Sequence, residues 1–262
     1  MKETRSNFAI RCAAAKRLLM WHALAKPLGL ILVTEFPKSG GTWFCQLIGE
    51  SCQIPFPRNQ APPFQQCVMH GHHLYRKQFG PTIAIVRDGR DVMVSAYHHF
   101  MIGVDIIPPR VVNRFRSRLL MDDYYDVKGN LPAFIEFMFE EFSKGIWHFS
   151  WSEFVSSVVD QPNVCLIKYE DMLRAPVDQL EAAIRFLEWP VPDRYRLQEA
   201  VDKFSFKNQS KRDPGQESKT SFLRKGIAGD WKNVFSSEAR DVFKRYGAYE
   251  LIKAGYERDD QW

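Results

Sequence analysis

The sequence predicts an α/β fold, in which a central parallel sheet carries helices on both faces. Candidate strands recur at 29–34, 66–70, 82–86 and 163–168; the first holds an apolar, β-branched run and the third is a short apolar run that fits a buried parallel strand. Longer segments with helical periodicity separate these runs, as they do in parallel α/β sheets. The chain has 262 residues and is 45% hydrophobic, which is enough for one large core. We therefore expect a single domain over residues 1–262.

Several of the expected helices carry start signals, such as Pro176 in a first turn and Ser236 before an acidic residue. The expected helices are 42–51, 90–101, 131–143, 148–159, 176–187, 194–203 and 236–246. Residues 54–66 and 102–130, which contain several prolines, are expected to be irregular and to line a pocket. Residues 1–28 are expected to form a helical extension. Lysines and arginines gather toward 204–228, which we expect to be a mobile cationic loop.

A glycine-bearing turn follows the first expected strand. Residues 36–43 read Phe-Pro-Lys-Ser-Gly-Gly-Thr-Trp, and a helix is expected directly after them. Backbone N–H groups of such a turn converge with the positive end of the helix dipole, which favours an anion. Lys38 adds a full charge, and Ser39 and Thr42 add hydroxyl donors. The pattern is not the common P-loop, because the lysine precedes both glycines. The alternative on this segment alone is an ordinary strand-to-helix turn.

A second polar segment follows the apolar run at 82–86. Residues 87–91 read Arg-Asp-Gly-Arg-Asp, and helical periodicity begins at Asp91, so Ser95 lies about two turns from the strand end. Ligands of open α/β sheets bind at the carboxyl ends of strands, which suits Arg87 for a phosphate. The alternative is that Arg87 and Arg90 pair with neighbouring aspartates on a solvated turn.

Two later segments complete a recognisable set. Residues 166–172 read Leu-Ile-Lys-Tyr-Glu-Asp-Met, and residues 222–233 read Phe-Leu-Arg-Lys-Gly-Ile-Ala-Gly-Asp-Trp-Lys-Asn. A doubly cationic Arg-Lys-Gly loop is suited to closing over a phosphate. In order and spacing, the four motifs resemble the sulfotransferases that use 3′-phosphoadenosine 5′-phosphosulfate (PAPS), especially the cytosolic type. The resemblance extends from about residue 30 to about residue 235.

The resemblance implies a role for each matching residue. The phosphosulfate loop would consist of Lys38, Ser39, Gly40, Gly41 and Thr42, with Lys38 nearest the bridging oxygen. The 3′-phosphate would be bound by Arg87, Ser95, Arg224, Lys225 and Gly226. The adenine would lie among Trp43, Tyr169, Ser205 and Phe206. Lys38 and Ser95 are also expected to take part in catalysis, together with a histidine base.

The base is expected in residues 70–73, which read His-Gly-His-His. The family closes a Lys-Thr-His motif with its base, and this alignment selects His72, with His70 in place of the lysine. His70 and His73 remain alternatives. A histidine suits the task because the acceptor hydroxyl must lose a proton and imidazole titrates nearest neutral pH. A metal site is the rival interpretation, but no cysteine or carboxylate spacing supplies a third ligand, so no metal is expected.

Charge and cysteine content limit the partners. The formal net charge of +5 is modest and suits a polyanionic small molecule better than nucleic acid. The five cysteines are odd in number and lack paired spacing, which favours free thiols and a cytoplasmic location. Charged residues interrupt the apolar N-terminal segment, so no stable membrane anchor is expected. A targeting peptide is the alternative for that segment.

The sequence therefore predicts transfer of a sulfuryl group from PAPS to a hydroxyl or amine of a small acceptor. Apolar segments favour an aromatic, alcoholic or lipid-like acceptor over a polysaccharide. The alternatives are a catalytically inactive module that binds PAPS or its product adenosine 3′,5′-bisphosphate (PAP), and a nucleotide kinase. A homodimer is possible, although residues 232–241 retain only part of the family's dimer motif.

Overall fold

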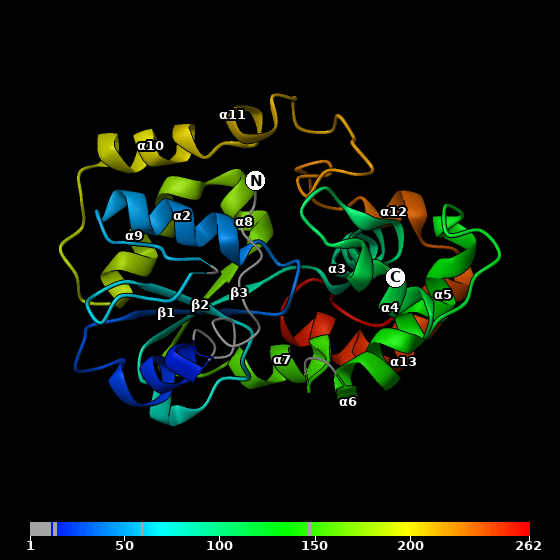
Figure 1. Cartoon of the computed structure of the whole chain (residues 1–262), viewed down its shortest axis with the longest axis horizontal. Coiled ribbons are helices and arrows are strands. Elements are labelled where there is room, and N and C mark those ends of the chain that lie inside the picture. Colours follow the sequence, from blue (N-terminus) through cyan, green and yellow to red (C-terminus); the bar gives the residue numbers. More distant parts are fainter. Residues whose placement is uncertain (1–11, 13–14, 59, 146–147) are drawn as a thin grey trace.

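The computed structural model describes residues 12, 15–58, 60–145 and 148–262. Within them, four parallel strands form one sheet in the order β2-β1-β3-β4. The strands are β1 (Ile31–Glu35), β2 (Val68–Gly71), β3 (Thr82–Val86) and β4 (Val164–Lys168). Each of the four predicted strands is present within two residues of its expected bounds. Figure 1 shows helices above and below this sheet, which confirms the predicted α/β fold.

Helices of varied length lie on both faces of the sheet and beyond its edge. They are α2 (Gly41–Ser51), α3 (Gly89–Tyr97), α4 (Pro109–Arg116), α5 (Val127–Phe137), α6 (Ser143–Gly145), α7 (Trp151–Val158), α8 (Tyr169–Arg174), α9 (Pro176–Phe186), α10 (Arg194–Lys203), α11 (Phe206–Ser210), α12 (Trp231–Val234) and α13 (Ser237–Lys253). Short 3₁₀ or π-helical turns are η1 (Met20–Leu24), η2 (Lys77–Phe79), η3 (His98–Gly103) and η4 (Met138–Phe142).

The prediction that 102–130 is irregular is wrong over α4 and the start of α5. Two consecutive prolines were interpreted as a helix breaker. However, Pro108 is the N-cap of α4 and Pro109 is its first residue, where the missing N–H has no intrahelical partner to lose. The predicted helix at 131–143 corresponds to α5 with its continuation η4, and α13 extends seven residues beyond its expected end.

Side chains of β1 alternate between two hydrophobic cores. Ile31 and Val33 are fully buried on the face covered by α2, α9 and α10. Leu32 points to the other face and joins a larger core with α3, α5, α7 and α13. Because successive strand residues point to opposite faces, an unbroken apolar strand is stable only when helices cover both faces.

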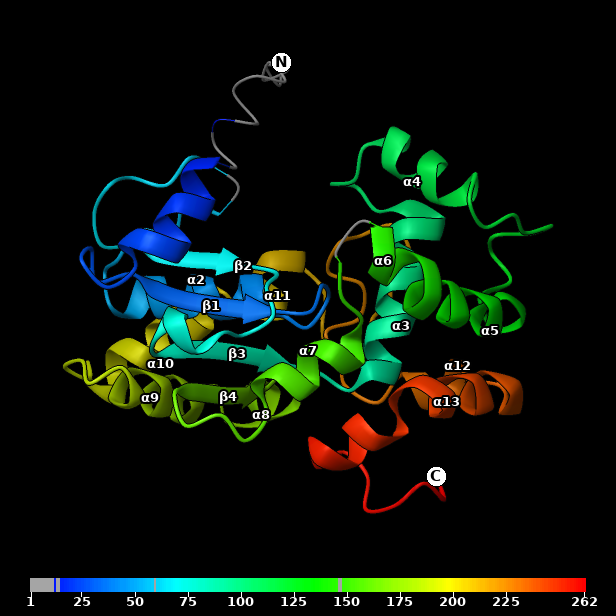
Figure 2. The ribbon, with the colours of Figure 1, turned by 90° about the horizontal axis from the view of Figure 1, so that it is seen from below.

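The carboxyl ends of the strands meet a second layer of helices. Figure 2 shows β1, β2 and β3 pointing toward α3, with α4, α5, α12 and α13 beyond it. Polar residues that follow β1, β2, β3 and β4 therefore lie near one edge, where open α/β sheets bind ligands.

The described part of the N-terminal segment is helical and packs on the domain. Residues 15–19 are helical and continue into η1, where Met20 and Trp21 are almost fully buried. The expectation for residues 1–11 and 13–14 lies outside the described residues. Within the described chain, no helix combines the length and the apolar character needed to cross a membrane. All five cysteines are free thiols, as predicted.

Arg90 of the second polar segment is a core residue. Its side chain is only 2% exposed and forms ion pairs with Asp88, at 2.7 Å, and with Glu257. Its guanidinium also stacks on the rings of Trp231 and Trp262, at 3.8 and 4.3 Å from their centroids. The pair with Asp88 therefore forms in the core, and not on the solvated turn that was the sequence alternative.

We predict that Arg90→Ala lowers the free energy of unfolding by roughly 3–5 kcal/mol, because it leaves a buried carboxylate without its partner. Urea unfolding monitored by circular dichroism measures this change. Arg185→Ala is the matched control, since Arg185 is 66% exposed and pairs with Glu181 on the surface. The control is expected to cost less than about 1 kcal/mol. Equal effects of the two changes would contradict the structural role of Arg90.

Candidate active site

The glycine-bearing turn lies between β1 and α2, as the sequence predicted. Gly40 has a φ of 98° and is the N-cap of α2. A Cβ atom at Gly40 would lie 2.6 Å from the ring of Tyr169, so both the backbone and the space require glycine. Lys38 also has a left-handed φ, of 76°. The turn thus brings Tyr169, from the end of β4, against the start of α2.

The ammonium of Lys38 is partly buried against His99. Lys38 Nζ lies 3.4 Å from His99 Nδ1 and 4.1 Å from the ring centroid of Phe222. Burial lowers the pKa of Lys38 to about 7, and the charges of Arg87 and Arg224 act in the same direction. Burial also lowers the pKa of His99 to about 3, so neutral imidazole accepts the hydrogen bond.

The role of His99 escaped the sequence analysis. Its spacing could have revealed it, because His99 follows Ser95 by four residues and therefore continues the same helical face. Ser95 itself is half-buried in the last turn of α3. His98, next to His99, is 5% exposed, and burial lowers its pKa to about 4.

Arg87 connects the first motif with the last. Its guanidinium donates to the backbone oxygens of Lys38, at 3.4 Å, and Ile227, at 3.2 Å. It also lies over the ring of Tyr169, 4.4 Å from the centroid. Burial opposes its charge, but the neighbouring Tyr169 and Asp91 raise the pKa of Arg87 above its ordinary value. A permanent cation is thereby held at the carboxyl end of β3.

Asp91 fastens the C-terminal segment to α3. Its carboxylate accepts the backbone N–H of Gly229 at 2.6 Å and that of Trp231 at 2.9 Å. The side chain is almost completely buried and lies 3.8 Å from Arg87. Although burial raises the pKa of Asp91, Arg87 and the two amides oppose that rise. Asp91 therefore joins two polar segments that lie about 140 residues apart in the chain.

Arg224 and Lys225 are held by acids within their own segment. Asp230 pairs with both of them, and its contact with Lys225 is 2.7 Å. Glu217 pairs with Arg224 at 2.7 Å. Burial opposes ionisation of Asp230, but the hydrogen bonds from Lys225 and Arg224 lower its pKa to about 2. The structure thus brings these cations to the site while an internal carboxylate neutralises them.

Aromatic rings surround the same edge. Trp43 and Tyr169 meet edge to face with centroids 6.1 Å apart. Phe206 lies against Gly226, whose φ is 65° and whose added Cβ would lie 2.3 Å from the Phe206 ring. Ser205, in the segment that was expected to be a mobile loop, caps α11 by accepting the N–H of Asn208.

Three buried polar atoms of the predicted site have no protein partner among the described residues. They are Ser39 Oγ, Trp43 Nε1 and Arg87 Nε. Buried polar atoms are nearly always hydrogen-bonded, so such atoms in one loop and its facing arginine suggest a ligand. Lys38 belongs to the same loop, which we interpret as a candidate anion site, although the Gly41 amide already donates to Glu35.

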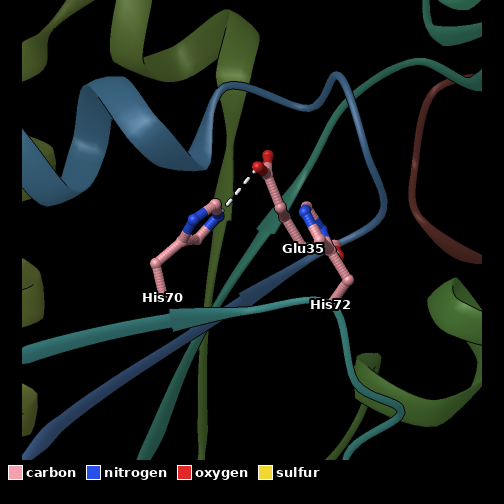
Figure 3. A group of neighbouring side chains, drawn as sticks. All are labelled: Glu35, His70 and His72. Atoms are coloured by element: carbon pink, nitrogen blue, oxygen red, sulfur yellow. Dashed lines mark hydrogen bonds and ion pairs between the residues drawn. The ribbon is translucent and has the colours of Figure 1, made fainter. Parts of the chain in front are cut away.

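The histidines beside this loop are organised by Glu35, the last residue of β1. His70 Nε2 is 2.9 Å from Glu35 Oε1, and the Gly41 N–H donates to Glu35 Oε2 at 2.6 Å. His72 Nδ1 lies 3.1 Å from the Glu35 carbonyl oxygen. Figure 3 shows the carboxylate between the two rings, whose centroids are 5.1 Å apart.

His73 belongs to the opposite face. Its ring packs on Trp21 with centroids 4.7 Å apart, and its N–H donates to the hydroxyl of Thr34. Burial and the neighbouring His22 lower the pKa of His73 to about 4. His70 and His72 thus share the environment of Glu35, whereas His73 packs against the N-terminal segment.

Glu35 also bears on the metal question. The sequence offered no third ligand for the histidines, but Glu35, His70 and His72 each have one ligating atom within 4.8 Å of the others. The argument that no carboxylate is available was therefore wrong. Glu35 was overlooked because it reads as the end of an apolar strand.

A cavity of about 1090 Å³ lies along the second half of α2, and none of the predicted site residues lines it. Its walls include Gln46, Ile54, Phe56, Tyr195 and Phe204. Phe56 also meets His70 edge to face, with centroids 6.4 Å apart. The proline-rich segment at 54–66 therefore contributes both to this cavity and to the surroundings of a candidate base.

The family match covers the last three of the four sequence motifs. The family description "Sulfotransferase domain" matches residues 80–255, about two thirds of the chain. The chain belongs to the sulfotransferase family. Curated sulfotransferases are similar to it over most of their length. Sulfotransferase 1C2 of Rattus norvegicus is 24% identical, with 84% of this chain and 81% of the relative covered. Cytosolic sulfotransferase 1 of Arabidopsis thaliana is 26% identical, with 79% and 74% covered.

Solved sulfotransferase structures share the fold. Mouse sulfotransferase SULT7A1 complexed with PAP has a TM-score of 0.59 at 20% identity, covering 86% of this chain and 87% of the other. Retinol dehydratase in complex with androsterone and PAP has a TM-score of 0.55 at 16% identity, covering 92% and 85%. The sulfotransferase fold predicted from the motifs is therefore confirmed for this chain.

We predict that Asp230→Asn increases backbone amide exchange across residues 212–228, because Arg224 and Lys225 lose the carboxylate that holds them. Hydrogen–deuterium exchange with mass spectrometry measures the effect. Glu217→Gln is the control, because Glu217 contacts the same two cations from a more exposed position. A smaller increase is expected for the control. Unchanged exchange in Asp230→Asn would show that Asp230 does not hold this segment.

Proposed function

We propose that this sulfotransferase moves a sulfuryl group from PAPS to a hydroxyl or amine of a small acceptor. The observation that carries the proposal is the anion site after β1, where Lys38 and unpaired polar atoms face Arg87. Membership of the family supports the reaction class. Both solved relatives described above are complexes with PAP, which supports PAPS as the co-substrate.

The nucleotide fits the residues that face this site. The loop amides, Ser39 and Thr42 would bind the 5′-phosphosulfate, at the positive end of α2. Trp43 and Tyr169 would contact the adenine, with Ser205 and Phe206 on its other side. The 3′-phosphate would take Arg87, Ser95, Arg224, Lys225 and Gly226. Arg224 and Lys225 would then exchange part of their contact with Asp230 for the phosphate.

The reaction follows from this placement. The acceptor oxygen attacks sulfur in line, forms the new S–O bond and displaces the bridging oxygen, which leaves as part of PAP. Lys38 stabilises the negative charge that develops on that oxygen. His72 takes the acceptor's proton, and burial, with the charge of His70, lowers the pKa of His72 to about 4. His72 is therefore neutral before the reaction, as a base must be.

Two aromatic side chains near the proposed site bear on the choice of acceptor. Phe56 lies beside His70 and Phe222 beside Lys38, which favours an aromatic, alcoholic or lipid-like acceptor. A panel of such acceptors with labelled PAPS identifies the acceptor, and it also distinguishes an enzyme from an inactive PAP-binding module.

The plant relative's name supports a cytoplasmic location. The homodimer, the mobile loop at 204–228 and the absence of a required metal stay predictions.

We predict that His72→Ala lowers kcat by roughly 10²-fold or more, the typical worth of general-base catalysis. PAP binding is expected to be retained. His70→Ala and His73→Ala are the matched comparisons and are expected to lose less activity. Steady-state kinetics with PAPS and the best acceptor measure all three. If the largest loss follows His70 or His73, the base is that residue.

We predict that Lys38→Met lowers kcat by roughly 10²-fold, as removal of an oxyanion donor does. The free lysine has a pKa of about 7, so its charge is lost as pH rises through that value. Bound PAP favours the charged form of Lys38. The affinity for PAP is therefore expected to fall as pH rises above 7, and to fall less in Lys38→Met. Calorimetry at several pH values measures this. A variant that changes only the KM for PAPS would exclude this role.

We predict that Arg87→Ala weakens PAP binding by about 1.5–3 kcal/mol, the range for hydrogen bonds to a charged group. Isothermal calorimetry measures the loss. Arg118→Ala is the control, because Arg118 pairs with Glu141 on the surface. An affinity equal to that of the control would remove Arg87 from the phosphate site.

A further inference from the structure

Glu35 is an acid placed where the proposed reaction needs positive charge. It lies at the carboxyl end of β1, is 4% exposed, and is adjacent to the loop that would bind a polyanion. A buried carboxylate is costly unless it is paired, and here it would also repel the anionic co-substrate. The contacts of Glu35 must therefore offset the cost of burying its charge.

Glu35 has partners for both carboxylate oxygens and for its backbone oxygen. One carboxylate oxygen meets His70, the other accepts the Gly41 N–H, and the backbone oxygen meets His72. The strand pairing produces this arrangement. Val33 lies opposite His70 in the register of β1 and β2, and period-2 alternation places Glu35 on the same face, two residues further along. One residue thus holds both rings and the first amide of α2.

The contact with the carbonyl oxygen assigns the tautomer of His72. A carbonyl oxygen only accepts, so Nδ1 carries the hydrogen and Nε2 carries the lone pair. A base needs that lone pair. Once His72 takes a proton it becomes a buried cation, and the nearby carboxylate stabilises this cation.

The charges around the group agree with this role. His70 and His73 lower the pKa of His72, while Glu35 raises it. Burial alone would raise the pKa of the Glu35 carboxyl, but His70, His72 and the Gly41 amide lower it, so the carboxylate stays ionised. The Glu35 carboxylate also raises the pKa of Lys38, while burial lowers it.

We propose that Glu35 is a positioning residue for sulfuryl transfer, which fixes His70 and Gly41 through its carboxylate and holds His72 in the tautomer that accepts the proton. This inference rests on the proposed function, because it assigns the support of the proposed base. The rival is a divalent cation held by Glu35, His70 and His72. Glu35 is chosen as a proton-transfer support because both of its carboxylate oxygens already have partners and Lys38 adds a cation nearby.

The test is Glu35→Gln, which keeps the shape and an acceptor for Gly41 but removes the charge. The expected result is a fall in kcat of roughly 10- to 100-fold, a part of the 10²–10⁴-fold that a general base is worth. PAP binding by calorimetry is expected not to weaken, since a negative charge leaves the anion site. The acidic limb of the kcat profile is expected to move to lower pH, because the base loses its stabilising carboxylate.

Glu50→Gln is the matched control. It is the same chemical change, made in α2, and Glu50 pairs with Lys203 on the surface. It is expected to leave kcat and its pH profile unchanged. Wild-type kcat in Glu35→Gln would overturn the inference, and so would a loss of kcat accompanied by weaker PAP binding with no shift of the acidic limb.

A double variant separates this inference from the proposed function. If Glu35 acts through His72, adding Glu35→Gln to His72→Ala costs little further activity. Full activity of His72→Ala would refute the base itself. Loss in His72→Ala with no loss in Glu35→Gln would refute only the role of Glu35. Loss of wild-type activity in chelator, restored by Zn²⁺, would overturn the inference in favour of the cation.

Discussion

The buried carboxylate of Asp91 is the constraint on which the site depends. It accepts two backbone amides of the segment at 229–231, while Arg87, one turn earlier, reaches the backbone oxygens of Lys38 and Ile227. Segments that are far apart in the chain therefore converge on the carboxyl ends of β1 and β3. Two N–H donors and a neighbouring arginine thus satisfy this buried acid. Through Arg87 and Asp91, the loop after β1 and the segment at 229–231 are joined in one frame.

Within this frame, positive charge is concentrated and kept in check. Burial lowers the pKa of Lys38 to about 7, and the cations Arg87 and Arg224 add to that effect. Asp230 neutralises Arg224 and Lys225, and Glu35 raises the pKa of Lys38. A polyanionic co-substrate would replace these internal partners with its own charges. The acids thus stabilise the clustered cations before a nucleotide binds.

Part of this was predictable because local patterns carry it. The four strands are short and mainly apolar, and β1 and β3 carry apolar residues toward both faces, which requires cover on both faces. The loop from Lys38 to Thr42 is a strand–turn–helix pattern with glycine at one of its two positions that have a left-handed φ. The helix α4 was missed because Pro109 was interpreted as a breaker, although proline is favourable in a first turn. Glu35 was missed because its partners His70 and Gly41 lie in β2 and α2, at distances the sequence does not encode, whereas the spacing of His99 from Ser95 was a local signal.

The sequence by itself therefore determined the fold class and the reaction class, because these depend on short contiguous patterns, whereas the anion loop stays a prediction. The tertiary structure decided which side chains meet. It placed Lys38 against His99, turned His73 toward Trp21, and set His70 and His72 around Glu35. Strand register and burial set those contacts, and both arise only when the sheet is assembled. The physical reason is that a pattern specifies the face of an element, whereas packing selects the partner on that face.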